Sequence, residues 1–373
     1  VTAYRAGLPL WQSSRFDLQT RELDVLEEVF QSYINLLSQR ALLVIDIDNY
    51  HLIQRYLELA RSRQRSGVAG PEELYRWEAQ LAAARSAMLR SLANMSIAQT
   101  QLNQAMGNDA DDLWSPADLE ELTEANPCLA PEFSANITDD REFEALTAFL
   151  LRQALDESPE LRAVDAAITA QTMVFNQYRR RRFVPEVGVS FTYDHTFDRT
   201  RPSGSLPLPL DLPQDDDDDW SVLVGASWSL FEGGGQAADV RRARAELRRL
   251  RELRRQARQA VTQRLYAALL SLAGSQPDLH LTRQAAELAG KNLEVIQEKY
   301  ARGAVAIVDL LDAQTDTFVR EQRSALARYQ FMLDIFRTQR AIGWLPELRT
   351  SEQRAAWVQA LKYNVYHHQE DAP

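Results

Sequence analysis

The chain has 373 residues, of which 45% are hydrophobic and 25% charged, and its formal net charge is −11. This acidic balance argues against nucleic acid as the main partner. The single cysteine, Cys128, excludes an internal disulfide and a cysteine-rich metal site. The sequence contains no run of 18 apolar residues, so no transmembrane helix is expected. No signal peptide is visible at the start of the sequence, which is expected either of a cytosolic protein or of a chain whose N-terminus has been removed or was never included.

The first part of the chain predicts two long helices, from about Asp17 to Gly107, because Gly and Pro are sparse and a breaker cluster at 67–71 separates two periodic stretches. Large apolar residues recur every seven positions in the second stretch, and mostly small residues follow three positions later. The large positions are Leu74, Leu81, Met88, Met95 and Leu102, and the small set is Trp77, Ala84, Ser91, Ala98 and Ala105. This pattern favours closely packed helices.

The middle of the chain begins with a connector rich in Pro, Asp and Asn, over about 108–138. Ser158, Pro159 and Glu160 then predict a helix start, with a capping serine and an early acid, and this helix should end before Pro185. After Gly233 a helical pattern runs to about Arg302, with a kink or short break expected at 274–277. The last long helix is expected over 307–342, and the tail after Gly343 shows no clear pattern.

Two segments of about ten residues alternate between apolar and small or polar residues, as β-strands do. The outward apolar residues are Val187, Val189, Phe191 and Tyr193 in the first segment, and Val222, Val224 and Trp228 in the second. Aromatic residues near the strand ends, Phe231 among them, are typical of a lipid-facing strand. The edge of a soluble sheet is the alternative. The run Asp215–Asp219 between the strands predicts a solvated acidic loop.

Two strands cannot close a barrel, and an open sheet cannot lie in lipid because its edges would stay unsatisfied. If these strands enter a membrane, the remaining strands must come from other subunits, from a preceding part of the chain, or from both.

The two helical regions repeat each other at a constant offset of 236 residues. Gly67 pairs with Gly303, Glu73 with Asp309, and Gly107 with Gly343. We therefore divide the chain into a first repeat (1–107), a connector (108–157), a second repeat (158–343) and a tail (344–373). The second repeat holds a β-hairpin over 185–231 and long helices over 233–342. The first repeat is expected to be incomplete, beginning with the end of a strand over 8–12.

These features together resemble the TolC-like outer membrane efflux family. The resemblance is carried by residues 158–170, 179–193, 224–234, 298–314 and 329–343, with the duplicated segment 65–74. It implies a mainly α fold with a small β portion, in which long antiparallel coiled-coil helices form a periplasmic tunnel and the strands join a trimeric transmembrane β-barrel. It further implies a homotrimeric exit duct in the outer membrane of a Gram-negative bacterium, docked to a periplasmic adaptor protein and an inner-membrane pump.

The resemblance also implies a gate at the helix turns after Gly67 and Gly303. Asp309 and Asp312 match the acidic constriction, and threefold symmetry would turn them into rings of carboxylates that favour cations. The alternative is that both are first-turn acids stabilised by the helix dipole.

Tyr300 and Glu73 match positions of the family that latch neighbouring helices. Val305 stands where the family often has a basic residue, and Arg302 is the expected substitute.

No catalytic motif, phosphate-binding loop or metal-ligand spacing is present, so we predict no enzyme activity, cofactor or metal. The arginine-rich run 241–258 lacks interleaved aromatics and predicts a solvated helix face, although it could also meet anionic lipid head groups. A soluble coiled-coil scaffold, or a periplasmic adaptor-like hairpin protein, is the competing interpretation of the whole chain. The adaptor form would need a lipoyl-type β domain, and none is visible.

Overall fold

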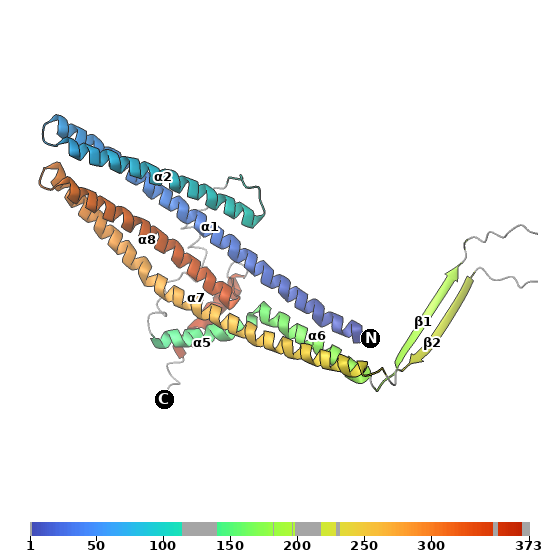
Figure 1. Ribbon diagram of the computed structural model, residues 1–373. Helices are drawn as coiled ribbons and strands as arrows, with labels where there is room; N and C mark the ends of the chain where they lie inside the picture. Colours follow the sequence, from blue (N-terminus) through green and yellow to red (C-terminus); the bar gives the residue numbers. More distant parts are fainter. Residues whose placement is uncertain are drawn as a thin grey trace, which may run out of the picture. The chain divides into compact units, whose positions relative to one another are not determined.

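The computed structural model describes residues 2–113, 140–181, 183–195, 197, 218–228, 232–345 and 350–367. Long helices dominate these residues (Figure 1). The chain divides into two compact units, one made of 1–13 with 164–254 and the other of 14–163 with 255–373. Cys128, Asp215–Asp217 and Phe231, for which expectations follow from the sequence, lie outside the described residues, as does most of the connector.

The second unit contains most of two helical hairpins, which repeat at the offset seen in the sequence. Helix α1 (Thr2–Arg65) turns into α2 (Pro71–Met106), and α7 (Gly235–Ala301) turns into α8 (Ile307–Ile342). Helices α2 and α8 both have 36 residues, and their first residues are 236 positions apart (307 − 71). The duplication in the sequence is therefore a duplication of the hairpin.

The heptad pattern of α2 forms a packed seam, in which the two sets of heptad positions are buried to different extents. Trp77, Ala84 and Ala98, from the set of mostly small positions, are buried, whereas the large residues at the other positions are half-buried, apart from Leu102, which is buried as well. Small side chains let the neighbouring helix approach closely, and Trp77 fills the wider space near the turn. Leu36 of α1 packs with Ala98 and Leu102 further along the seam.

Three expectations about element boundaries are wrong. Residues 8–12 are helical, inside α1, although a strand end is expected there; five residues are too few to separate a period of 2 from one of 3.6. Helix α7 continues through Pro277, so the expected break is absent there and only a kink stays a prediction; buried residues on both sides, Leu272 and Thr282, hold the helix against its neighbours. The connector and the tail both contain a helix, α5 (Asp140–Glu157) and α9 (Ser351–His367).

Helices α5 and α9 belong to a core that surrounds the middle of α7 and the end of α8. Leu146 and Leu150 of α5 pack with Leu265 and Leu269 of α7, and these four side chains are fully buried. The rings of Trp344 and Trp357 stack at 4.2 Å between centroids, and the indole N–H of Trp357 donates to Gln153 at 2.8 Å. The tail thus belongs to the folded core of this unit.

The first unit contains an antiparallel β-hairpin of β1 (Glu186–His195) and β2 (Asp218–Ser227). It lies between α6 (Pro159–Arg181), which ends before Pro185 as expected, and α7. The register pairs Val189 with Val224, Phe191 with Val222 and Tyr193 with Trp220. Paired residues share a face, so the apolar residues of both strands form one continuous surface.

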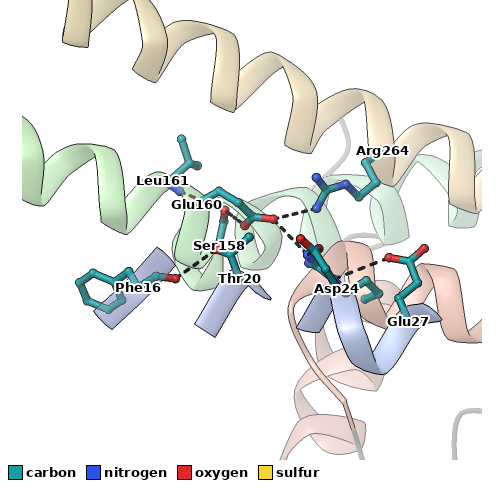
Figure 2. A network of polar contacts seen from close by, with 9 residues as sticks. Phe16, Thr20, Asp24, Glu27, Ser158, Glu160, Leu161 and Arg264 are labelled. Carbon is teal, nitrogen blue, oxygen red and sulfur yellow. Dashed lines mark hydrogen bonds and ion pairs between the residues drawn. The ribbon is translucent and has the colours of Figure 1, made fainter. Parts of the chain in front are cut away.

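A polar network joins α1, the start of α6, α7 and the end of α8 within the second unit (Figure 2). Arg340 is at its centre, with only 3% of its side chain exposed. Its guanidinium donates to Asp24 at 2.7 Å and to Glu160 at 3.3 Å. Glu27 lies 3.8 Å away. A buried cation needs such partners, because an isolated charge in the interior is very costly.

Glu160 receives a second cation and a hydroxyl in the same network. Arg264 donates to Oε1 at 2.9 Å and Ser158 donates to Oε2 at 2.7 Å, while Ser158 also caps α6 by accepting from the N–H of Leu161 at 3.3 Å. Burial alone would raise the pKa of Glu160, but the hydrogen bonds and the charge of Arg340 overcome it and lower this pKa to about 2. The carboxylate therefore stabilises the fold in its charged form.

We predict that Glu160→Gln lowers the free energy of unfolding at neutral pH by roughly 3 kcal/mol, which is the magnitude expected from its pKa shift. The pKa is lowered from 4.5 to about 2 on folding, so this stability is present above pH 4.5 and is lost as the pH falls towards 2. Thermal unfolding followed by circular dichroism between pH 2 and 7 measures it. The exposed Glu144→Gln on α5 is the control, and equal pH dependence of Glu160→Gln and the parent chain would contradict the assignment.

Candidate functional site

Both hairpins turn on a glycine in the left-handed conformation. Gly67 and Gly303 have φ of 73°, a value that residues with a Cβ rarely adopt. In each turn the glycine N–H and the next N–H bond back to the helix: Gly67 to Gln64 at 2.9 Å and Val68 to Arg63 at 3.0 Å, with equivalent bonds at 303 and 304. These paired bonds are a Schellman motif, which ends each helix and turns the chain at its glycine.

The ends of the four helices next to these turns share one core. Tyr56 of α1, Trp77 of α2, Tyr300 of α7 and Leu310 of α8 are all almost fully buried there. The rings of Tyr56 and Trp77 lie 4.9 Å apart. Both turns therefore belong to a single packed end of the second unit, as Figure 1 also shows.

A polar contact joins the two hairpins inside this core. The hydroxyl of Tyr300 donates to Oε1 of Glu73, which links α7 to α2. Arg63 of α1 completes the group: its guanidinium donates to the carbonyl of Tyr300 at 2.7 Å, lies 4.5 Å from the Tyr300 ring centroid, and has Nε 3.5 Å from Glu73. We call Arg63, Glu73 and Tyr300 the latch group.

The charge of Glu73 is held in a poorly solvated place. Burial raises its pKa, Arg63 opposes this, and Glu72 adds a smaller increase. Burial thus outweighs the ion pair, so the contact depends on the hydrogen bond from Tyr300 as well as on Arg63.

Arg302, the expected basic partner, does not lie in this group. Its side chain is 76% exposed and pairs with Glu298 at 3.2 Å, one helical turn back on α7. Arg63 takes the place expected for Arg302. The signal was present in the repeat, since Arg63 occupies the position of Lys299 in the second copy, four residues before the turn glycine.

Asp309 and Asp312 lie in the first two turns of α8 and are exposed. Oδ2 of Asp309 accepts the N–H of Ala306 at 3.0 Å, so this residue also caps the helix, as the helix-dipole alternative expects. In the first repeat the same two positions are Glu73 and Arg76. The equivalent of Asp309 is thus buried in the latch group, while Asp309 itself is open to solvent.

Further polar side chains connect the hairpins above the latch group. Gln314 of α8 donates to Asn49 of α1, and Gln80 of α2 donates to Gln314 at 3.5 Å. Asp46, which is buried, accepts from Ser91 of α2 and from Gln322 of α8, the latter at 3.0 Å. This ladder fixes the register of α8 against α1 and α2, because a shift along the axis would leave buried polar atoms unpaired.

The apolar face of the β-hairpin is uncovered. All the strand residues expected to face lipid are exposed: Val187, Val189, Phe191, Tyr193, Val222 and Val224. Trp228 follows the end of β2 and is 52% exposed. A continuous apolar surface of this kind is rare on a soluble monomer and marks a contact with lipid or another chain.

Within the described ranges, no group of three or more His, Cys, Asp or Glu side chains could hold a metal ion. Among the same residues, no helix has an apolar stretch long enough to cross a membrane.

Long paired helices, two glycine turns joined by a buried polar contact and an uncovered β-hairpin define a helical-hairpin protein with a small β portion whose apolar face is exposed. The model of the outer membrane efflux protein family matches residues 150–343, just over half of the chain. The chain belongs to the outer membrane efflux protein family.

Individual proteins agree with this assignment. Outer membrane protein TolC of Escherichia coli (strain K12) is 29% identical over 126 residues, which is 33% of this chain and 26% of that protein. TolC of Salmonella enteritidis is 27% identical over the same length. The chain thus spans about a quarter of the length of the curated relatives it matches.

Solved structures share the fold at lower identity. The outer-membrane channel OprN has a TM-score of 0.72 and 19% identity, covering 92% of this chain and 71% of that one. The CmeC outer membrane channel of Campylobacter jejuni has a TM-score of 0.70 and 15% identity, covering 97% and 71%.

We predict that Tyr300→Phe lowers the free energy of unfolding by about 1.5–3 kcal/mol, because it removes a hydrogen bond to a buried carboxylate. Chemical denaturation of Tyr300→Phe, Glu73→Gln and the double variant gives their coupling energy. The control is Tyr75→Phe, an exposed tyrosine of α2, which should change stability by less than about 0.5 kcal/mol. Additive effects of the two latch substitutions would contradict a direct contact.

Proposed function

We propose that this chain is one subunit of a homotrimeric exit duct in the outer membrane of a Gram-negative bacterium. The duct is a passive path for efflux or type I secretion, working with a periplasmic adaptor protein and an inner-membrane pump. The observation that carries the proposal is the uncovered apolar face of β1 and β2, which continues directly into long paired helices.

The strand pair supports assembly from several chains. Two strands leave a free edge on each side, and unpaired N–H and C=O groups are very costly in lipid. Strands from further subunits would pair these edges and close the sheet. The same assembly would cover the exposed apolar residues of α1, such as Leu18 and Val25, against a neighbouring copy.

The latch group would act as a gate at the periplasmic end. It joins the α1–α2 hairpin to the α7–α8 hairpin next to both turns, so breaking it would free the two hairpins to separate there. The polar ladder above the latch group would keep the remainder of the helices in register. An opening limited to the tip is therefore the movement that these contacts favour.

Asp309 and Asp312 would form the constriction. They are exposed and one helical turn apart, so three copies around an axis would give two stacked rings of carboxylates. Such rings favour cations and repel anions.

We predict that the double variant Arg63→Gln with Tyr300→Phe increases conductance in planar bilayers. Removing a contact worth about 1.5–3 kcal/mol shifts a closed–open equilibrium by roughly tenfold or more. Conductance of single trimers measures the shift. Arg302→Gln with Tyr75→Phe is the matched control, because both side chains are exposed near the same turns, and it should behave as the parent chain.

The same preparation tests the duct itself. Membrane fractionation should place the protein in the outer membrane, and it should insert into bilayers as a trimer. A protein that stays in the soluble fraction, or trimers that insert without conducting even when the latch is broken, would contradict the proposed function.

We predict that Asp309→Ala with Asp312→Ala weakens cation selectivity and block by divalent cations, because it removes two rings of negative charge. Reversal potentials in a salt gradient measure the selectivity. Asp156→Ala with Glu352→Ala removes the same number of exposed acids far from the turns and should leave selectivity unchanged. Unaltered selectivity in an inserted Asp309/Asp312 trimer would contradict the assignment of the constriction.

A further inference from the structure

Six arginines gather where the helices of the first unit meet the β-hairpin. Arg179, Arg180 and Arg181 end α6, while Arg241, Arg242 and Arg244 lie in the first turns of α7, and all six are exposed. We call these six residues the arginine cluster. The two helices lie side by side here: Gln171 donates to the carbonyl of Ala243 at 3.3 Å, and Arg244 lies 6.0 Å from the Phe175 ring.

The charge of the cluster is poorly balanced by its own chain. In the described stretches 176–181 and 232–244, the acids are Glu232 and Asp239, and the first of these lies 3.9 Å from Arg181. Arg179, Arg180, Arg241 and Arg242 form no ion pair with any residue that the structure describes. Concentrated charge of one sign is repulsive, so an anionic partner would stabilise the cluster.

Further arginines follow along α7, and two of them pair within the chain. Arg249 pairs with Glu246 at 2.6 Å, and Arg254 pairs with Asp165. Intrachain pairs of this kind suit a solvated helix face, which is what the sequence predicts for the whole run. The arginine cluster is set apart by its place, because its six residues lie at the ends of α6 and α7 that adjoin the strands.

Aromatic residues near the arginine cluster indicate where it would lie relative to the boundary between lipid and water. Phe183 is 71% exposed and lies two residues after Arg181, and Trp228 is 52% exposed directly after β2. Exposed aromatic residues at strand ends are typical of the boundary between lipid and water. The head-group layer beyond that boundary is about 5–8 Å thick on each side. Arg241 lies about 9 Å along α7 from the first residue of this helix, slightly more than the thickness of the head-group layer. A long arginine side chain can reach back over that distance to the head groups.

We infer that the arginine cluster binds the phosphate groups of anionic phospholipids in the leaflet of the outer membrane that faces the periplasm. The planar guanidinium matches a phosphate with two parallel hydrogen bonds, and its attraction to an anionic surface adds to this. The inference rests on the proposed function, because it requires the hairpin to lie in that membrane. It adds a lipid preference, which anchors the helical part at a fixed depth below the barrel.

The test uses the full chain reconstituted in bilayers that contain brominated phosphatidylglycerol or brominated phosphatidylethanolamine. Bromine quenches nearby tryptophans, so the ratio of quenching by the two lipids measures which lipid is enriched around Trp228. A Trp228→Phe variant identifies the contribution of this residue. Each arginine near an anionic surface favours binding roughly fivefold, so phosphatidylglycerol should be enriched several-fold at low salt and less at high salt.

Replacing Arg179, Arg180, Arg241 and Arg242 by Gln should bring the ratio of the two lipids close to one. The matched control replaces Arg248, Arg251, Arg258 and Arg283 by Gln. It removes the same charge from exposed positions that lie at least about 20 Å along α7 from its first residue. This control should keep the preference for phosphatidylglycerol. Quenching by both lipids without any preference, or a preference equally lost in the control, would overturn the inference while leaving the membrane position intact. Absence of quenching by either lipid would overturn the membrane position and the inference together.

Discussion

The contact between the two helical hairpins is the interaction on which the rest of this structure depends. Neither hairpin could bury its apolar stripe alone, and each provides the surface that the other lacks. The contact is held at two places along the second unit, by the Arg340 network at one and by the latch group at the other. Between them, a ladder of buried polar side chains sets the register of α8 against α1 and α2.

The Arg340 network and the latch group stabilise the contact between the hairpins in different ways. Arg340 has carboxylates from α1 and α6 around it and is almost completely buried, so moving any of these helices would leave a charge without a partner. The latch group depends on one hydroxyl, one carboxylate and one guanidinium, and burial works against its carboxylate. In the proposed duct, the latch group is therefore the contact whose loss would let the hairpins separate next to the turns, while the Arg340 network would keep them together further along.

The β-hairpin sets a second constraint, which concerns what surrounds the chain. Among the described residues its apolar face is uncovered and neither edge is paired. In the proposed duct, lipid would cover the face and strands of further subunits would pair with the edges. The arginines beside the hairpin complete a sequence of environments along α6 and α7, from apolar strands through aromatic residues to guanidinium groups, that follows the order of layers in a bilayer.

Much of this architecture was already determined by local patterns in the sequence. The turn glycines, the duplicated hairpin, the start of α6 at Ser158 and the two strands all depend on residues close together in the chain, where spacing and backbone preference decide the structure. Tyr300 and Glu73 could be selected together because the resemblance to a family points to their positions. The helical course of residues 8–12, the continuity of α7 past Pro277 and the helices α5 and α9 were missed.

Only the tertiary structure decided which groups share one site. The sequence pointed to Arg302, two residues after Tyr300, but Arg302 is exposed to solvent, while Arg63 lies on Tyr300 from 237 positions away in the chain. The Arg340 network likewise joins residues from α1, α6, α7 and α8 that no local pattern connects. The physical reason is that a periodic sequence specifies which face of a helix is buried, whereas the partner of a buried charge depends on how the faces of distant helices meet.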